Sequence, residues 1–129
     1  TFIFPFKFEN ASTIPKNCEG REISWNNGLS HLVRTSELVL CPSLWSYTPE
    51  AAMLKSFIWT DNVFFVEVPN SFGTEVPNNL GIKGSGDLML DVEALQSFFS
   101  KPKIIDSSVG VNFVQHFVKN FENSGNNLK

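Results

Sequence analysis

The sequence predicts a small α/β domain built on a parallel sheet. Two continuous apolar runs carry this prediction, residues 37–41 (ELVLC) and 63–68 (VFFVEV), and each is followed directly by a proline. Such runs are typical of strands buried on both faces, which occur in parallel sheets. Helix-like segments lie before, between and after the two runs. This alternation predicts a doubly wound, Rossmann-like sheet with right-handed crossovers.

The N-terminal third predicts short elements. Phenylalanine alternates with other residues over 1–8, which indicates a strand, and Pro5 favours an edge strand or an early end. Residues 9–20 are rich in polar residues, Pro and Gly and predict a loop. A short strand is expected over 21–25, and apolar residues at helical spacing predict a short helix over 28–36.

The strongest helix prediction lies between the two apolar runs. Pro49 suits the first helical position, where a missing N–H costs nothing. Thr48 before it is a suitable N-cap, and Glu50 in the first turn matches the helix dipole. Asp61 and Asn62 are expected to end this helix.

The C-terminal part predicts a long loop and two helices. Residues 70–86 are rich in Gly, Pro and Asn and predict the loop, with a short strand near 80–82. Residues 91–100 predict an amphipathic helix with Asp91 as its N-cap, and residues 109–121 predict a second helix with an apolar stripe.

Length and composition suit one globular domain. We expect it to cover residues 1–123 of the 129, with a polar, flexible tail over 124–129. The 13 phenylalanines predict a core rich in aromatic rings. Because the sequence begins with Thr rather than Met, we expect it to be a piece of a longer protein.

Charge and hydropathy argue against several partners. A net charge of −3 does not favour nucleic acid. No apolar run reaches the roughly 18 residues that a membrane span needs, and residues 1–8 lack the basic start of a signal peptide. We therefore expect neither nucleic acid nor a membrane span, and a cytoplasmic location.

The two cysteines, Cys18 and Cys41, do not have the spacing of a zinc site. Cys41 ends an apolar run and is expected to be a buried free thiol, although pairing of the two cysteines stays open. No metal cluster and no cofactor motif is visible, so neither a metal nor a cofactor is expected.

The most informative segment is 38–55, in which a predicted strand is followed by Pro-Ser, an aromatic loop and a helix. Ligands of α/β sheets bind beyond the carboxyl ends of the strands. Unpaired N–H groups at a helix start favour an anion there, and a diphosphate suits them. Ser46, Tyr47 and Thr48 offer hydroxyls beside those amides. An ordinary βα turn that binds no ligand is the alternative.

The residues HLVRTSELVLCPSLWSYTPEAAMLKS (31–56) resemble the C-terminal half of GT-B glycosyltransferases. The loop 72–77 and the helix 91–100 also fall where that domain has a donor-side loop and a following helix. More narrowly, PSLWS…PEAAMLKS is similar to the final domain of sugar-transferase proteins found beside sugar methyltransferases in bacteria and large viruses. The resemblance spans about residues 22–101. It implies a Rossmann-like, nucleotide-sugar-binding half of a GT-B architecture.

The resemblance implies roles for individual side chains. Glu50 would be the catalytic carboxylate at the sugar or ribose, and Lys55 would compensate the diphosphate charge. Trp25 or Trp45 would stack on the base, and Glu75 would reach the sugar. The alternatives are dipole stabilisation by Glu50, a solvated Lys55, buried packing of the tryptophans and a solvated Glu75.

The sequence departs from the retaining GT-B pattern at one point. That pattern has two glutamates eight positions apart, and here the two positions fall near Ser46 and Leu54. Glu50, between them, is the nearest carboxylate. Either Glu50 acts with Lys55 in a divergent site, or the domain binds without catalysing.

The expected function is therefore that of a glycosyltransferase donor-binding domain. It would transfer a sugar from a nucleoside diphosphate sugar to a glycan acceptor, with a second domain of the parent protein on the acceptor side. The isolated chain is expected to be inactive. The alternative is a non-catalytic α/β scaffold. A phosphoacceptor receiver domain needs acidic residues at the strand ends, where this sequence has Cys41 and Pro69.

Overall fold

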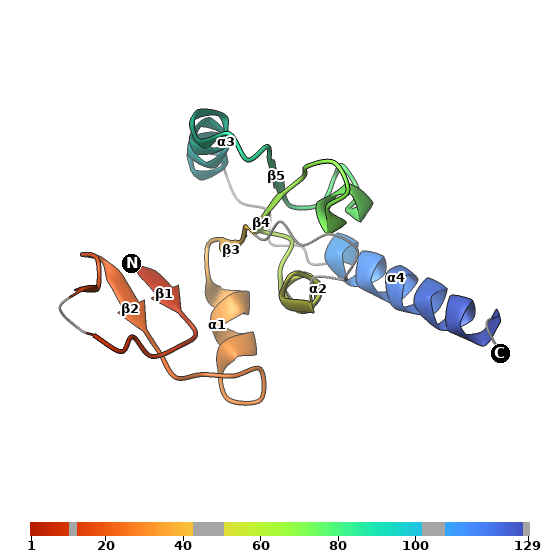
Figure 1. The fold of residues 1–129 in the computed structure, drawn as a ribbon, viewed down its shortest axis with the longest axis horizontal. Coiled ribbons are helices and arrows are strands. Elements are labelled where there is room, and N and C mark those ends of the chain that lie inside the picture. Colours follow the sequence, from red (N-terminus) through yellow and green to blue (C-terminus); the bar gives the residue numbers. More distant parts are fainter. Residues whose placement is uncertain (11–12, 43–50, 102–107, 128–129) are drawn as a thin grey trace. The chain divides into compact units, whose positions relative to one another are not determined.

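The structure, a computed structural model, describes residues 1–10, 13–42, 51–101 and 108–127. Its strands and helices confirm the predicted mixed α/β class, and the strands of each of its two sheets are parallel (Figure 1). Contacts divide the chain into two compact units, Thr1–Thr35 and Ser36–Lys129. A single domain over 1–123 stays a prediction.

The first unit contains a two-stranded parallel sheet and one helix. Strand β1 (Phe2–Phe4) pairs with β2 (Cys18–Gly20), and helix α1 (Leu29–Thr35) follows. The predicted helix over 28–36 is thus confirmed.

The strand predicted over 21–25 is wrong, because Ser24 makes only isolated bridges there. The second strand of the unit lies instead at the end of the predicted loop, in the sequence Cys-Glu-Gly. Asn17 adopts a left-handed φ of 68° directly before it, and its carbonyl accepts a hydrogen bond from the Phe2 N–H at 2.8 Å. Backbone pairing with β1, rather than an apolar side-chain pattern, therefore defines β2.

The alternating phenylalanines of the N-terminus pack on one another. The ring centroids of Phe4, Phe6 and Phe8 lie 5.3 to 5.5 Å apart in all three pairs. Gly20 allows the chain to approach them, because a Cβ there would contact the Phe8 ring at 2.8 Å. The pattern that predicts a strand thus also forms a small aromatic cluster.

On the exposed side of β2, the Arg21 guanidinium donates to the Glu19 carboxylate at 2.8 Å. This hydrogen bond lowers the pKa of Glu19 and raises that of Arg21. Both side chains are about half exposed, so the pair adds little to stability.

The second unit is built on a three-stranded parallel sheet in the order β3-β4-β5. Its strands are β3 (Val39–Cys41), β4 (Val63–Val66) and β5 (Ile82–Gly84). Helix α2 (Ala51–Trp59) connects the first two, and the short 3₁₀ helix η2 (Phe72–Glu75) lies between β4 and β5.

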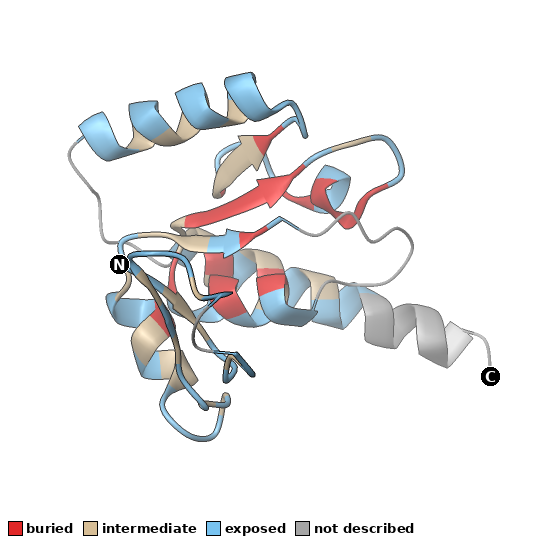
Figure 2. Cartoon of the chain, turned by 60° about the vertical axis from the view of Figure 1, so that its left-hand side comes forward, coloured by how far each residue is buried: buried red, intermediate tan, exposed pale blue. Residues whose placement is uncertain are grey.

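The central strand β4 is buried along its whole length, which confirms the prediction from its apolar run (Figure 2). The same prediction is wrong for β3, because Leu40 is 45% exposed. Leu40 alternates with Val39 and Cys41, which pack in the core, so its side chain lies on the other face of the sheet, which is open to solvent at this strand.

Two helices follow the sheet, α3 (Leu88–Ser100) and α4 (Ser108–Asn127). Asp91 is not the N-cap of α3. Asp87 is the cap and accepts a hydrogen bond from the Leu90 N–H at 3.1 Å, so the helix begins earlier than predicted. Helix α4 extends over residues 124–127, where the sequence predicts a tail.

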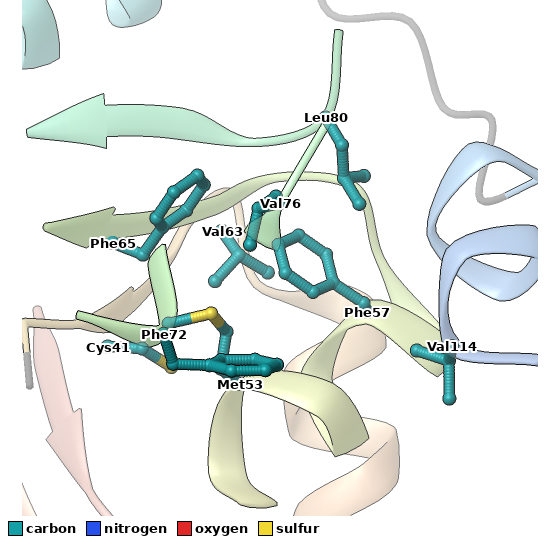
Figure 3. Packing of buried hydrophobic residues seen from close by; sticks show 9 residues of the cluster. All are labelled: Cys41, Met53, Phe57, Val63, Phe65, Phe72, Val76, Leu80 and Val114. Atoms are coloured by element: carbon teal, nitrogen blue, oxygen red, sulfur yellow. The ribbon is translucent and has the colours of Figure 1, made fainter. Parts of the chain in front are cut away.

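The core of the second unit lies on the face of the sheet that α2, η2 and α4 cover (Figure 3). Nine buried residues form it: Cys41, Met53, Phe57, Val63, Phe65, Phe72, Val76, Leu80 and Val114. The predicted wealth of aromatic rings is confirmed, because Phe57 contacts the rings of Phe65 and Phe113 at centroid distances of 6.2 and 6.0 Å. Cys41 is buried, and neither Cys41 nor Cys18 forms a disulfide.

Helix α4 is fixed to α2 at its first turn. The Gly110 N–H donates to the carboxylate of Asp61, which follows α2, at 2.9 Å. A Cβ on Gly110 would collide with the Phe57 carbonyl, so the two helix backbones are in close contact. This contact holds α4 against the helix that leads into the central strand.

Candidate functional site

The parallel register of the second unit brings three strand ends to one edge of the sheet. Cys41 is level with Phe65, and Val66 is level with Gly84. Ligands of open α/β sheets bind beyond this carboxyl edge. The described strands follow one another in chain order, so strand order does not reverse within this sheet, and any site there depends on the loops.

Four of the predicted site residues, Ser46, Tyr47, Thr48 and Glu50, lie outside the described residues. Helix α2 begins just after them, at Ala51. The diphosphate seat at the start of this helix therefore stays a prediction.

The other predicted residues lie on three different elements. Lys55 is exposed on α2, on the side opposite the buried Met53 and Phe57. Glu75 is exposed at the end of η2. Trp25 is half-buried in the first unit, before α1. The structure brings Lys55 and Glu75 into one unit, and it describes no common site for either of them with Trp25.

The segment that carries Glu75 is tied to the carboxyl end of β4. The Ser71 hydroxyl accepts a hydrogen bond from the Val68 N–H at 3.1 Å and donates to the Val66 carbonyl at 3.5 Å. Gly73 packs directly against the same Val66 carbonyl, in a space that has no room for a Cβ. These contacts hold the 3₁₀ turn that carries Glu75 against the end of the central strand.

An ion pair that the sequence analysis missed links the ends of β4 and β5. The Lys83 ammonium lies 2.7 Å from the Glu67 carboxylate and donates to the Asn78 side-chain oxygen at 2.8 Å. Glu67 is the one charged residue of the run VFFVEV. A charged residue inside an apolar run indicates a nearby partner of opposite charge, and this signal was present in the sequence. The pair offsets the positive charge of Lys83 at this edge.

The turn after β5 contains an anion-binding site that is occupied by a carboxylate of the protein itself. The Asp91 carboxylate accepts hydrogen bonds from the Ser85 N–H at 2.6 Å, the Gly86 N–H at 3.0 Å and the Ser85 hydroxyl at 3.1 Å. Successive backbone amides of this kind bind phosphate in many proteins. Here they hold a side chain of α3, so they fix that helix to β5.

We expect Asp91→Ala to lower the free energy of unfolding by about 1–2 kcal/mol, because three donors to a carboxylate lose their acceptor. Urea unfolding followed by circular dichroism measures the change. Glu93→Ala, at an exposed position of the same helix, is the control and should change the value by less than about 0.5 kcal/mol. Equal effects of the two variants would contradict the proposed anchoring role.

Among the described residues, no three His, Cys, Asp or Glu side chains gather in a way that could hold a metal ion. No helix in the same part of the chain combines the length and apolarity needed to cross a membrane. Searches against known protein families, curated proteins and solved structures found no match to this chain.

Proposed function

We propose that the chain is the donor-binding domain of a glycosyltransferase and holds a nucleoside diphosphate sugar at the carboxyl edge of the β3-β4-β5 sheet. One observation carries the proposal. Parallel pairing places the end of β3 beside the end of β4. Helix α2 follows β3 in the chain, and η2, which carries Glu75, follows β4. The resemblance of residues 31–56 to GT-B donor domains supports the same edge.

The charges of the described residues favour one orientation of the donor. Lys83 is paired with Glu67, and the Ser85 and Gly86 amides are taken by Asp91. The β5 side of the edge therefore offers little to a diphosphate. We place the diphosphate on the β3 side, at the start of the α2 helix and toward Lys55, and the sugar toward Glu75.

This orientation suits the chemistry of sugar transfer. The bond between the anomeric carbon and the diphosphate oxygen breaks, and a bond to the acceptor hydroxyl oxygen forms while that hydroxyl loses its proton. Negative charge develops on the leaving diphosphate. Backbone N–H groups at the start of α2 and the Lys55 ammonium would stabilise that charge. Glu50 would contact the sugar or ribose, and a second domain would bring the glycan acceptor.

Isothermal titration with a panel of nucleoside diphosphates and their sugars tests the proposal. We expect one nucleoside diphosphate to bind, and Lys55→Ala to weaken it about three- to tenfold through the lost charge. Glu75→Gln should weaken only the nucleoside diphosphate sugar, because Glu75 is assigned to the sugar.

Lys119→Ala, at an exposed position of α4, is the control and should leave both affinities unchanged. A folded sample that binds no member of the panel would refute the proposal. The absence of binding would instead favour the alternative, a non-catalytic α/β scaffold. The exposed apolar side chains of α3 are the observation that supports this alternative.

A further inference from the structure

The turn before helix α1 contains the one Asn-Gly pair of the sequence, Asn27-Gly28. Both residues are exposed. An asparagine side-chain amide can be attacked by the backbone nitrogen of the next residue, which closes a five-membered succinimide ring. Glycine favours this attack because it has no Cβ to hinder the approach. In a folded protein the reaction also requires that the attacking nitrogen is not held in a hydrogen bond.

Two backbone hydrogen bonds hold this turn, and neither uses the Gly28 nitrogen. The N–H groups of Asn27 and Leu29 both donate to the Ser24 carbonyl, at 2.9 and 3.0 Å. The Gly28 N–H lies between them and has no hydrogen-bond partner in the part of the chain that the structure describes. A Cβ on Gly28 would meet no atom within 4 Å apart from its chain neighbours, so the space around this nitrogen is open.

Asn70 provides a contrast within the same protein. The nitrogen that follows it belongs to Ser71, which is buried, and its N–H donates to the Val68 carbonyl at 3.0 Å. A hydrogen-bonded N–H loses its proton only when the structure opens locally, as amide hydrogen exchange shows. The fold therefore protects Asn70 and leaves Asn27 unprotected.

We propose that Asn27 is a site of spontaneous deamidation in the folded protein. The Gly28 nitrogen gives its proton to solvent and forms a bond to the Asn27 Cγ. The bond from Cγ to Nδ2 breaks, and Nδ2 takes up a proton and leaves as ammonia. Water then opens the succinimide ring. Attack of water on Cγ gives aspartate at residue 27, and attack on the main-chain carbonyl carbon gives isoaspartate.

The two products differ in their effect on the turn. Aspartate keeps the length of the backbone, whereas isoaspartate inserts one CH₂ group into the backbone between residues 27 and 28. The added group displaces the Leu29 N–H from the Ser24 carbonyl. Hydrogen exchange of the Leu29 amide should therefore be at least about tenfold faster in the isoaspartate form than in Asn27→Asp. Equal exchange in the two forms would overturn this effect on the turn.

Incubation of the full chain in mildly alkaline buffer, followed by peptide mapping with mass spectrometry, tests the proposal. Rates are measured in the folded protein and in concentrated guanidinium chloride. The rates at Asn27 should agree within about threefold, because the fold does not protect this residue. Asn70 should react at least about tenfold more slowly in the folded protein than in the denatured one.

Asn27→Gln is the matched variant, because its longer side chain would have to close a six-membered ring. It should abolish the reaction at residue 27 and leave the circular dichroism spectrum unchanged. Asn26→Gln, at the exposed neighbouring position, is the control and should leave the rate at Asn27 unchanged. A folded rate at Asn27 that lies more than about threefold below the denatured rate, or protection of Asn27 equal to that of Asn70, overturns the proposal.

Discussion

Replacing Phe57 by alanine should lower the free energy of unfolding of the second unit by about 3–5 kcal/mol. Phe57 is fully buried, with a relative exposure of 0%, at the centre of the core. Its ring contacts those of Phe65 on β4 and Phe113 on α4, so its loss leaves a cavity between three elements. Urea unfolding followed by circular dichroism gives the free energy.

Ile58→Ala is the matched control for this prediction. Ile58 is the next residue of the same helix and is 42% exposed, so its truncation should cost less than about 1 kcal/mol. If the two substitutions cost the same, α2 does not pack as described. Phe57→Ala should lose nucleoside diphosphate binding only through unfolding. Binding and the circular dichroism signal of this variant should therefore be lost at the same urea concentration.

Replacing Gly110 by alanine should destabilise the second unit by about 1–3 kcal/mol, because the added methyl group overpacks the contact between α2 and α4. In an ordinary helix the same change stabilises by about 1 kcal/mol. The sign reverses here because the new Cβ collides with the Phe57 carbonyl and lies 2.6 Å from the Asp61 carboxylate oxygen. The hydrogen bond from the Gly110 N–H to Asp61 is strained or lost as well.

The sign of this effect is measured most directly by comparing Gly110→Ala with Asn112→Ala in thermal unfolding. Asn112 is exposed two residues later in the same helix, and alanine there should leave the midpoint unchanged or raise it slightly. A higher midpoint for Gly110→Ala would show that α4 does not approach α2 as closely as described.

The sequence predicts those elements whose hydrophobic pattern is contained in one segment and extends over many residues. The apolar run 63–68 gives the buried central strand, and helical spacing over 109–121 gives most of α4. The edge position of β3 is not encoded in its own residues, since ELVLC has the same pattern as a central strand. Which strand has one neighbour and which has two is decided by pairing between distant segments. Which of the faces of β3 another element covers is also decided by distant segments, and Leu40 lies on the face that stays exposed.

Short elements defined by the backbone were the least predictable. β2 consists of Cys-Glu-Gly and depends on pairing with β1 and on the left-handed Asn17. The same limit applies to the candidate site. Glu75 could be chosen from its loop, but its attachment to the end of β4 depends on Ser71 and Gly73, which carry no charge. The pairing of Lys83 with Glu67 joins two strands whose register no local pattern contains.

The core of the second unit draws on residues from Cys41 to Val114, and this has a consequence for biosynthesis. Side chains so far apart along the chain meet only when the later ones are available. While the ribosome has released residues only as far as α3, the apolar surface around Phe57 has no α4 to cover it. The second unit should therefore complete its folding only after α4 has left the ribosome, and nascent chains arrested before Val114 should be those that chaperones retain.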